Sequence, residues 1–342
     1  MFMKRLLLII SSILTLTACS NEGFPVHKEN KAIAFSNVAT RAEVTEASAI
    51  TEFKVFGEMN LGDDGTDEAS QWVTLFDEGE LVSREGSSDN WTYDNKRYWV
   101  DNRTFRFFAF YPSSTNVRRI AMPNGWVYSS TIEVPYAANT DFMTAMPDAT
   151  YVTPGVTPGT VDLSFKHRFA RVRFNIYKNA VMNTDDSFVV TDIGISGISR
   201  TANFTAYFAS GQPYEFTLSP NAANGTVLRR NLAYDIAVGE VNEGVLTGGT
   251  LLLGDNDGLL LIPQDISNGQ ASLNLSFTYK QKEGTEVEYQ TISKPLPGGY
   301  AWEAGKTYVY TLELKDDKNI YISTPTVEGW GTTQPGGFII IN

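Results

Sequence analysis

Residues 104–111 carry the strongest structural signal in the chain. The run Thr-Phe-Arg-Phe-Phe-Ala-Phe-Tyr is dense in aromatic residues, which favour a pleated, half-buried strand. Because successive side chains of a strand point to opposite faces, Phe105, Phe107, Ala109 and Tyr111 would share one face. Pro112 follows and has no N–H to donate, so the strand is expected to end there. The chain must therefore fold around sheets that bury large rings.

The same period of two recurs along the chain, and no segment keeps a helical period of 3.6 residues over three turns. Two aromatic runs, 91–93 and 97–100, are expected to pair as a hairpin. Further runs bounded by Gly, Asn, Asp and Pro predict strands over residues 31–36, 52–57, 162–167, 170–177, 189–195, 201–208, 259–263, 271–279, 286–292 and 306–314. The sequence predicts an all-β fold, and short strands at this spacing suggest sandwiches.

Length and charge limit the organisation of the chain and its partners. A chain of 342 residues exceeds one comfortable core, so two domains are expected. The strand pattern lapses between residues 178 and 186, which places the boundary between domains 42–180 and 181–342. The formal net charge of −12 argues against nucleic acid as a partner and against electrostatic attraction to an anionic membrane.

The N-terminus has the layout of a secretory signal that ends in a lipidation site. Lys4 and Arg5 precede an apolar run over residues 6–16, which is too short to span a membrane. Ala18 followed by Cys19 is typical of a lipobox, where a peptidase removes the signal peptide 1–18 and Cys19 carries the lipid. Cys19 is the only cysteine, so acylation, for example with palmitate, leaves no orphan thiol. The lipid would anchor the protein to a membrane.

The C-terminus is unusually apolar for a chain end. Residues 318–323 predict a strand, Pro325 interrupts it, residues 327–330 resume it, and residues 338–341 are Phe-Ile-Ile-Ile. A terminus is usually polar and frayed. This one is expected to be buried, either in its own domain or in another molecule.

Several short motifs, taken together in their order and spacing, resemble the fimbrillin (Mfa-like) family of type V pilus subunits. The resemblance runs from Ile33 to Trp330, after the lipobox at Cys19. The motifs are Ile-Ala-Phe at 33–35, Thr-Arg-Ala at 40–42, Phe-Lys-Val-Phe-Gly at 53–57, Arg-Phe-Phe-Ala-Phe-Tyr-Pro at 106–112, Asp-Phe-Met-Thr-Ala at 141–145, Phe-Lys-His-Arg-Phe-Ala-Arg-Val at 165–172, Leu-Ile-Pro-Gln at 261–264, Ala-Gly-Lys-Thr-Tyr at 304–308 and Val-Glu-Gly-Trp at 327–330.

The resemblance implies a lipoprotein precursor on the outer membrane surface, built from two transthyretin-like β-sandwich domains in tandem. An arginine-specific protease would cut between Arg41 and Ala42, removing residues 19–41, a tether and an N-terminal strand with Ile33 and Phe35. The groove that opens would accept a strand from another fimbrial subunit, and the mature protein would be extracellular, in the fimbria.

In stalk subunits of the family the donor strand is C-terminal, which corresponds here to residues 319–342. Ile320, Ile322, Phe338 and Ile340 are the expected inward residues of that strand. A tip subunit would need a groove without a donor, and it could grip a host or bacterial surface ligand. An anchor subunit would keep its lipid and need no cut, which the Thr-Arg-Ala site disfavours.

The sequence offers little catalytic or metal-binding chemistry. The chain has two histidines: His27 lies in the tether, and His167 is interpreted as a strand-end residue. With Cys19 acylated, neither a Cys-His nor a Ser-His arrangement is credible, so no enzyme activity and no cofactor are expected. The acidic runs 63–68 and 255–258 are interpreted as turns, because neither completes a calcium-binding loop.

A second hypothesis is a binding module. An uncut, monomeric surface lipoprotein would hold a glycan or a host protein through exposed aromatics such as Trp72 or Trp91. A third hypothesis, an outer-membrane enzyme acting on polysaccharide, ranks last because no pair of catalytic carboxylates stands out.

Overall fold

The computed structural model describes residues 31–37, 50–62, 72–86, 90–122, 125–134, 140–179, 185–208, 215–223, 225–242, 245–253, 258–284, 287–315, 319–330 and 338–339. These residues form strands and no helix, so the predicted all-β class is confirmed. Correspondingly, no helix that could cross a membrane occurs in them.

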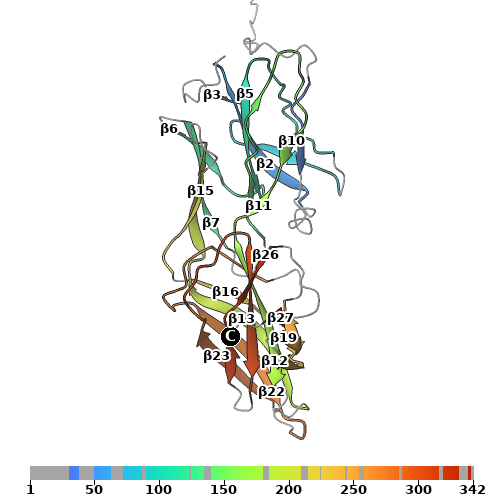
Figure 1. The fold of residues 1–342 in the computed structure, drawn as a ribbon, viewed down its shortest axis with the longest axis vertical. Helices are drawn as coiled ribbons and strands as arrows, with labels where there is room; N and C mark the ends of the chain where they lie inside the picture. The colour runs from blue at the N-terminus through green and yellow to red at the C-terminus, as the bar shows by residue number, and fades with distance from the viewer. Residues whose placement is uncertain are drawn as a thin grey trace, which may run out of the picture.

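Sheets of the N-terminal half lie at one end of the molecule (Figure 1). The first is a pair, β1 (Phe35–Asn37) and β10 (Val161–Leu163). The second has the order β11-β8-β5-β2-β3, in which β4 also pairs with β2 and β9 with β5. Its strands are β2 (Glu52–Asn60), β3 (Trp72–Thr74), β4 (Glu80–Ser83), β5 (Thr104–Tyr111), β8 (Met143–Ala145), β9 (Thr150–Tyr151) and β11 (Lys166–His167).

Two further sheets, one of nine strands and one of five, share a core at the other end (Figure 1). One follows the order β25-β24-β12-β18-β19-β27, with β20 and β21 on β12 and β26 on β24; the other follows β16-β13-β22-β23, with β17 on β13. The strands of the first are β12 (Ala170–Asn179), β18 (Val238–Asn242), β19 (Val245–Gly248), β20 (Thr250–Leu252), β21 (Leu259–Leu261), β24 (Lys306–Leu314), β25 (Ile320–Ile322), β26 (Thr326–Gly329) and β27 (Phe338–Ile339). Those of the second are β13 (Ser187–Ile198), β16 (Gly225–Arg229), β17 (Tyr234–Asp235), β22 (Ser272–Lys280) and β23 (Glu288–Pro295).

A fifth sheet joins the two halves of the chain. Its order is β15 (Glu215–Pro220), β14 (Thr201–Tyr207), β7 (Gly125–Glu133) and β6 (Arg118–Met122). β12, which precedes residue 180, pairs along its length with β24 from the end of the chain. The division into domains 42–180 and 181–342 stays a prediction. These pairings show that strands from both sides of residue 180 share the same sheets.

The aromatic strand β5 is buried on both of its faces. As predicted, Phe105, Phe107 and Ala109 lie together in one core, with Tyr111 packed against it. The opposite face carries Phe108 and Phe110, which belong to the other core. The alternation therefore separates two hydrophobic cores rather than a core from solvent, because a second sheet covers the face that a two-layer sandwich would expose.

A buried polar network connects the sheet that contains β2 and β5 to the fifth sheet, which we call the joining sheet. Arg106 Nε donates to Glu58 Oε2 at 2.8 Å, and the Tyr128 hydroxyl donates to Glu58 Oε1 at 2.6 Å. Glu58 is fully buried and Arg106 is 5% exposed. The Arg106 guanidinium lies 3.8 Å from the Trp72 ring centroid and 4.5 Å from that of Phe208. Burial, reinforced by the Glu58 charge, raises the pKa of Tyr128 well above its usual value, so the hydroxyl keeps its proton.

We expect Glu58→Gln to lower the free energy of unfolding by about 3 kcal/mol or more, because it leaves the Arg106 charge buried without a counter-ion. Urea denaturation followed by tryptophan fluorescence measures this. Glu288→Gln, the same change at an exposed position of β23, is the control and should shift stability by less than about 0.5 kcal/mol. An unchanged midpoint for Glu58→Gln would show that the pair does not hold the sheets together.

Candidate functional site

The backbone of residues 31–35 is hydrogen-bonded on one side to residues 97–99. Ile33 N donates to the Arg97 carbonyl at 2.8 Å, and Trp99 N donates to the Lys31 carbonyl at 3.3 Å. The pairing is antiparallel, with Ala32 opposite Tyr98. The predicted hairpin between runs 91–93 and 97–100 is therefore wrong. The N-terminal segment takes the position beside 97–99, while Thr92 bridges to Ser83.

The other side of the same segment pairs with β10. The Val161 N–H donates to the Ala34 carbonyl at 2.8 Å, and β1 then runs parallel to β10, with Phe35 opposite Val161 and Ser36 opposite Asp162. β10 pairs with no other strand that the structure describes. The N-terminal segment thus fills a slot between two backbone edges.

The predicted inward residues of the segment, Ile33 and Phe35, are buried, at 1% and 4% exposure. The Phe35 ring lies among four aromatic rings, which we call the aromatic box. Their centroids are 5.5 to 6.5 Å from that of Phe35: Phe107, Tyr93, Phe53 and Phe76. Edge-on and tilted ring contacts of this kind are favourable. The slot therefore has an aromatic site at residue 35 and an aliphatic site at residue 33.

Tyr93 also fixes the backbone in the slot. Its hydroxyl donates to the Ile33 carbonyl at 2.8 Å in a buried position. Burial raises the pKa of Tyr93, so the hydroxyl keeps the proton that it donates. On the outward side Ser36 hydrogen-bonds the exposed carboxylate of Asp162. The segment is thus apolar inward and polar outward.

Most of the predicted donor segment is folded into its own chain. β25 and β26 both pair antiparallel with β24. Ile320 is 2% exposed in the larger core, and Ile322 packs against that core. β27 pairs its backbone with β19 over two residues, Phe338 opposite Leu246 and Ile339 opposite Val245. Ile340 lies outside the described residues, as do Cys19, Arg41 and Ala42.

Trp330 anchors the end of β26 to the body of the protein. Its ring stacks on His167 at a centroid distance of 4.2 Å and an angle of 13°, and the Arg171 guanidinium lies 4.7 Å from the ring centroid. His167 Nδ1 hydrogen-bonds the buried carboxylate of Asp141. Trp330 N also donates to the Gly305 carbonyl at 3.2 Å. The sequence did not reveal this anchor, because its members are far apart along the chain.

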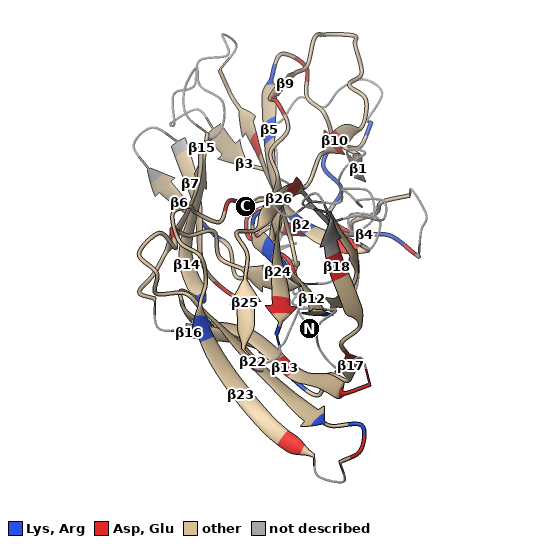
Figure 2. Ribbon diagram, turned by 60° about the horizontal axis from the view of Figure 1, so that its bottom comes forward, with Lys and Arg blue, Asp and Glu red and all other residues tan. Residues whose placement is uncertain are grey.

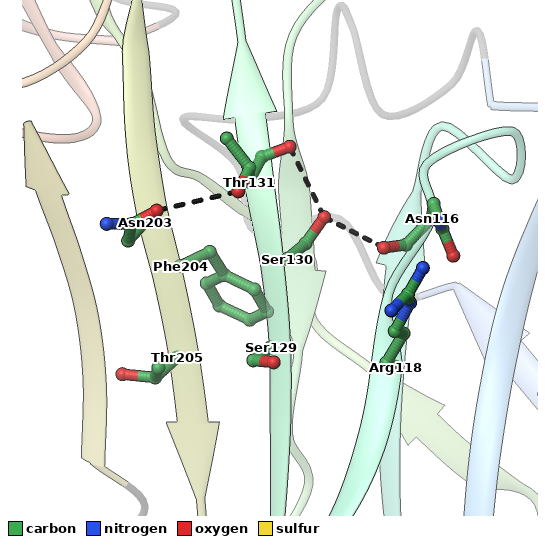
Figure 3. Close-up of a pocket in the computed structure, with 8 residues that line it drawn as sticks. All are labelled: Asn116, Arg118, Ser129, Ser130, Thr131, Asn203, Phe204 and Thr205. Atoms are coloured by element: carbon green, nitrogen blue, oxygen red, sulfur yellow. Dashed lines mark hydrogen bonds between the residues drawn. The ribbon is translucent and has the colours of Figure 1, made fainter. Parts of the chain in front are cut away.

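The outward face of the joining sheet holds a recess of about 480 Å³. Its lining consists of polar side chains together with Phe204. Figure 3 shows Thr131 of β7 facing Asn203 of β14, and Ser130 of β7 facing Asn116, which precedes β6. The Ser130 hydroxyl donates to the Asn116 carbonyl at 2.9 Å. Arg118 is the charged residue of the lining, and charged residues are sparse on β14 and β15 (Figure 2). The recess can offer hydroxyl, amide and guanidinium groups to a ligand.

The aromatics proposed for the binding hypothesis do not form an exposed platform. Trp72 is 5% exposed, beneath Arg106, and Trp91 is 8% exposed, with its ring 4.9 Å from that of Phe53. Their expected exposure is therefore wrong. Trp72 begins a strand of a sheet covered on both faces, and Trp91 closes the same core that holds Phe35.

The chain was compared with family models, with curated proteins and with solved structures. The fimbrillin-like family model matches residues 40–330. The fold is similar to that of a fimbrial protein from Bacteroides vulgatus ATCC 8482, with a TM-score of 0.62 and 18% identity over 88% of this chain and 100% of that one. A candidate cell adhesion protein from Bacteroides uniformis ATCC 8492 has a TM-score of 0.48 and 17% identity, covering 87% and 99% of the two chains. No curated protein matches the sequence.

We expect Phe35→Ala to destabilise the precursor by about 3–5 kcal/mol, because it empties the aromatic box. The free energy of unfolding from urea denaturation checks this. Ser36→Ala, next along the same strand and facing outward, is the control and should cost less than about 1 kcal/mol. Equal stability of the two variants would mean that the box does not depend on Phe35.

Proposed function

Because the chain belongs to the fimbrillin-like family, we propose that it is a structural subunit of a type V fimbria, in the stalk or at the tip. The match covers residues 40–330, and the fold resembles that of a fimbrial protein. In this proposal the partners are other fimbrial subunits, and the protein has no catalytic role. The precursor would stand on the outer membrane surface through a lipid on Cys19, and the mature subunit would be extracellular.

The observation that carries the mechanism is the slot that residues 31–35 occupy. Ile33 and Phe35 of this segment lie in the hydrophobic core, yet they precede Arg41, the expected cleavage site. A cut after Arg41 makes this buried strand a separate peptide, held by hydrogen bonds and packing alone. Loss of that peptide leaves the backbone groups of Arg97, Trp99 and β10 without partners and opens the aromatic box to solvent.

An empty slot favours the entry of another strand. Unpaired edges and exposed apolar surface promote strand addition, in which main-chain pairing contributes affinity and alternate side chains set the register. Burial of two side chains such as Ile and Phe contributes about 1.5–3 kcal/mol each. A donor from residues 319–342 of the next subunit would supply them. Because head-to-tail donation does not close on itself, it yields a filament.

The recess on the joining sheet favours a second candidate function, the binding of a surface ligand by a monomer. Its hydroxyl and amide groups suit a glycan, and Arg118 suits an acidic one. This candidate predicts an uncut, acylated protein that retains acidic glycans on an array. It is also compatible with a tip subunit.

We expect an arginine-specific protease to cut the precursor once, after Arg41, and the product to assemble into ladders of oligomers. Intact mass and size-exclusion chromatography measure both steps. Arg41→Ala should stay uncut and monomeric. Arg41→Lys, which keeps the charge but removes the protease's preferred residue, is the matched control and should behave in the same way.

Oligomers formed by uncut Arg41→Ala would exclude protease-triggered exchange. A clean cut without oligomers would indicate a tip subunit, whose groove accepts but whose C-terminus does not donate. Scattered cuts, or none at Arg41, would favour the monomeric binding protein.

A further inference from the structure

The two sites of the slot differ in size and come in a definite order. Along residues 31–37 the aliphatic site of Ile33 comes first, and the aromatic box around Phe35 comes two residues later. A strand that replaces residues 31–37 with the same packing must carry one aliphatic and one aromatic side chain two residues apart. Core sites tolerate changes of volume poorly, so size decides the fit.

The end of the chain supplies such a pair, but in the opposite order. Phe338 is the only aromatic residue after Trp330. The residue two positions before it is Gly336, and the residue two positions after it is Ile340. If Phe338 occupies the aromatic box, a strand in the direction of β1 places Gly336 at the aliphatic site and leaves that site empty. A strand in the reverse direction places Ile340 there.

We propose that residues 338–341 of a second copy of this chain enter the slot antiparallel to the strand that they replace, with Phe338 in the aromatic box and Ile340 at the Ile33 site. This inference rests on the proposed function. The exchanged strand then runs antiparallel to β10, whereas β1 runs parallel to it. It runs parallel to residues 97–99, whereas residues 31–33 are antiparallel to them. Exchange thus reverses both pairings.

Registers in the original direction fill the sites poorly. With Phe338 at the Ile33 site and Ile340 in the aromatic box, a ring is forced into an aliphatic site and the box is left partly empty. With Ile339 at the Ile33 site and Ile341 in the aromatic box, the box again holds an isoleucine. Overpacking and unfilled volume both destabilise a core. The reversed strand alone restores a residue of the original kind at each site.

The structure also favours this segment over residues 320–322 as the donor. Ile320 is buried in its own core, and Trp330 is held between His167 and Arg171. β27, in contrast, pairs with β19 over two residues. Eight residue steps separate Trp330 from Phe338, a reach of at most about 28 Å. We therefore expect residues 319–330 to stay with their own subunit during exchange.

Disulfide trapping distinguishes the two directions. Ser36 is half-buried and lies opposite the exposed Asp162 across the β1–β10 pair. In the reversed strand Gly337 takes the place of Ser36. In the original direction, Ile339 takes that place if Phe338 fills the aromatic box. Ile341 takes it if Ile340 fills the box. A precursor with Asp162→Cys is mixed with one carrying Gly337→Cys, Ile339→Cys or Ile341→Cys, both are cut at Arg41, and the polymers are oxidised. Cys19→Ser in each precursor removes the native thiol.

Cross-linked dimers should be at least about tenfold more abundant with Gly337→Cys than with Ile339→Cys or Ile341→Cys. The reason is that a misfilled site lowers the equilibrium constant for strand binding by more than about tenfold. Under reducing conditions all mixtures must polymerise like wild type, which controls for damage by the substitutions. Preferential cross-linking of Ile339→Cys or Ile341→Cys overturns the reversed direction. Polymers without any of these cross-links overturn residues 338–341 as the donor, although polymerisation itself would stand.

A swap of the two donor residues tests the size argument independently. In the double variant Phe338→Ile, Ile340→Phe, the aliphatic residue precedes the aromatic one, as in β1. The strand should then enter in the original direction, so that the dominant cross-link to Asp162→Cys moves from Gly337→Cys to Ile341→Cys. A dominant cross-link that stays at Gly337→Cys would show that side-chain order does not set the direction. A clean cut at Arg41 without polymer in the wild-type chain would overturn the stalk function itself, and this inference with it.

Discussion

The N-terminal half of the protein is completed by a short segment from near the start of the sequence. Residues 31–35 hydrogen-bond residues 97–99 on one side and β10 on the other, and their side chains complete an aromatic core. A backbone slot of this kind demands an occupant, because unpaired N–H and C=O groups beside an apolar surface are costly. The demand concerns the geometry of the occupant and not the chain that supplies it. In this structure the occupant is the chain's own segment 31–37.

The wall of the slot is rigid because it is part of a sheet packed on both faces. Phe53 and Phe107 face the slot from β2 and β5, while Phe56 and Phe108 on the same strands face the joining sheet. The Glu58, Arg106 and Tyr128 network adds directed hydrogen bonds on that second face. Close-packed layers deform little. Phe35 thus lies in an aromatic box whose β2 and β5 walls are packed on their opposite face as well.

The two ends of the chain are held in different ways. The N-terminal segment is held by the buried side chains of Ile33 and Phe35, whereas the C-terminal region is anchored at Ile320 and Trp330, and twelve residues of sequence follow Trp330. The anchor and the slot share one short stretch of chain. Residues 161–163 border the slot, Phe165 packs on Phe53 of its aromatic box, and His167 stacks on Trp330. The slot and the Trp330 anchor therefore meet in residues 161–167.

The sequence by itself determined the all-β class, the β5 side chains that share one face, and the apolar character of Ile33 and Phe35. A period of two reports which side chains lie on the same side of a strand. The sequence did not determine which strands lie side by side. The pairing of residues 97–99 with 31–33 instead of 91–93, the burial of Trp72 and Trp91, and the stacking of Trp330 on His167 were decided by the tertiary structure. The physical reason is that every residue except proline presents the same backbone donor and acceptor, so strand partners are selected by packing between segments far apart in the chain.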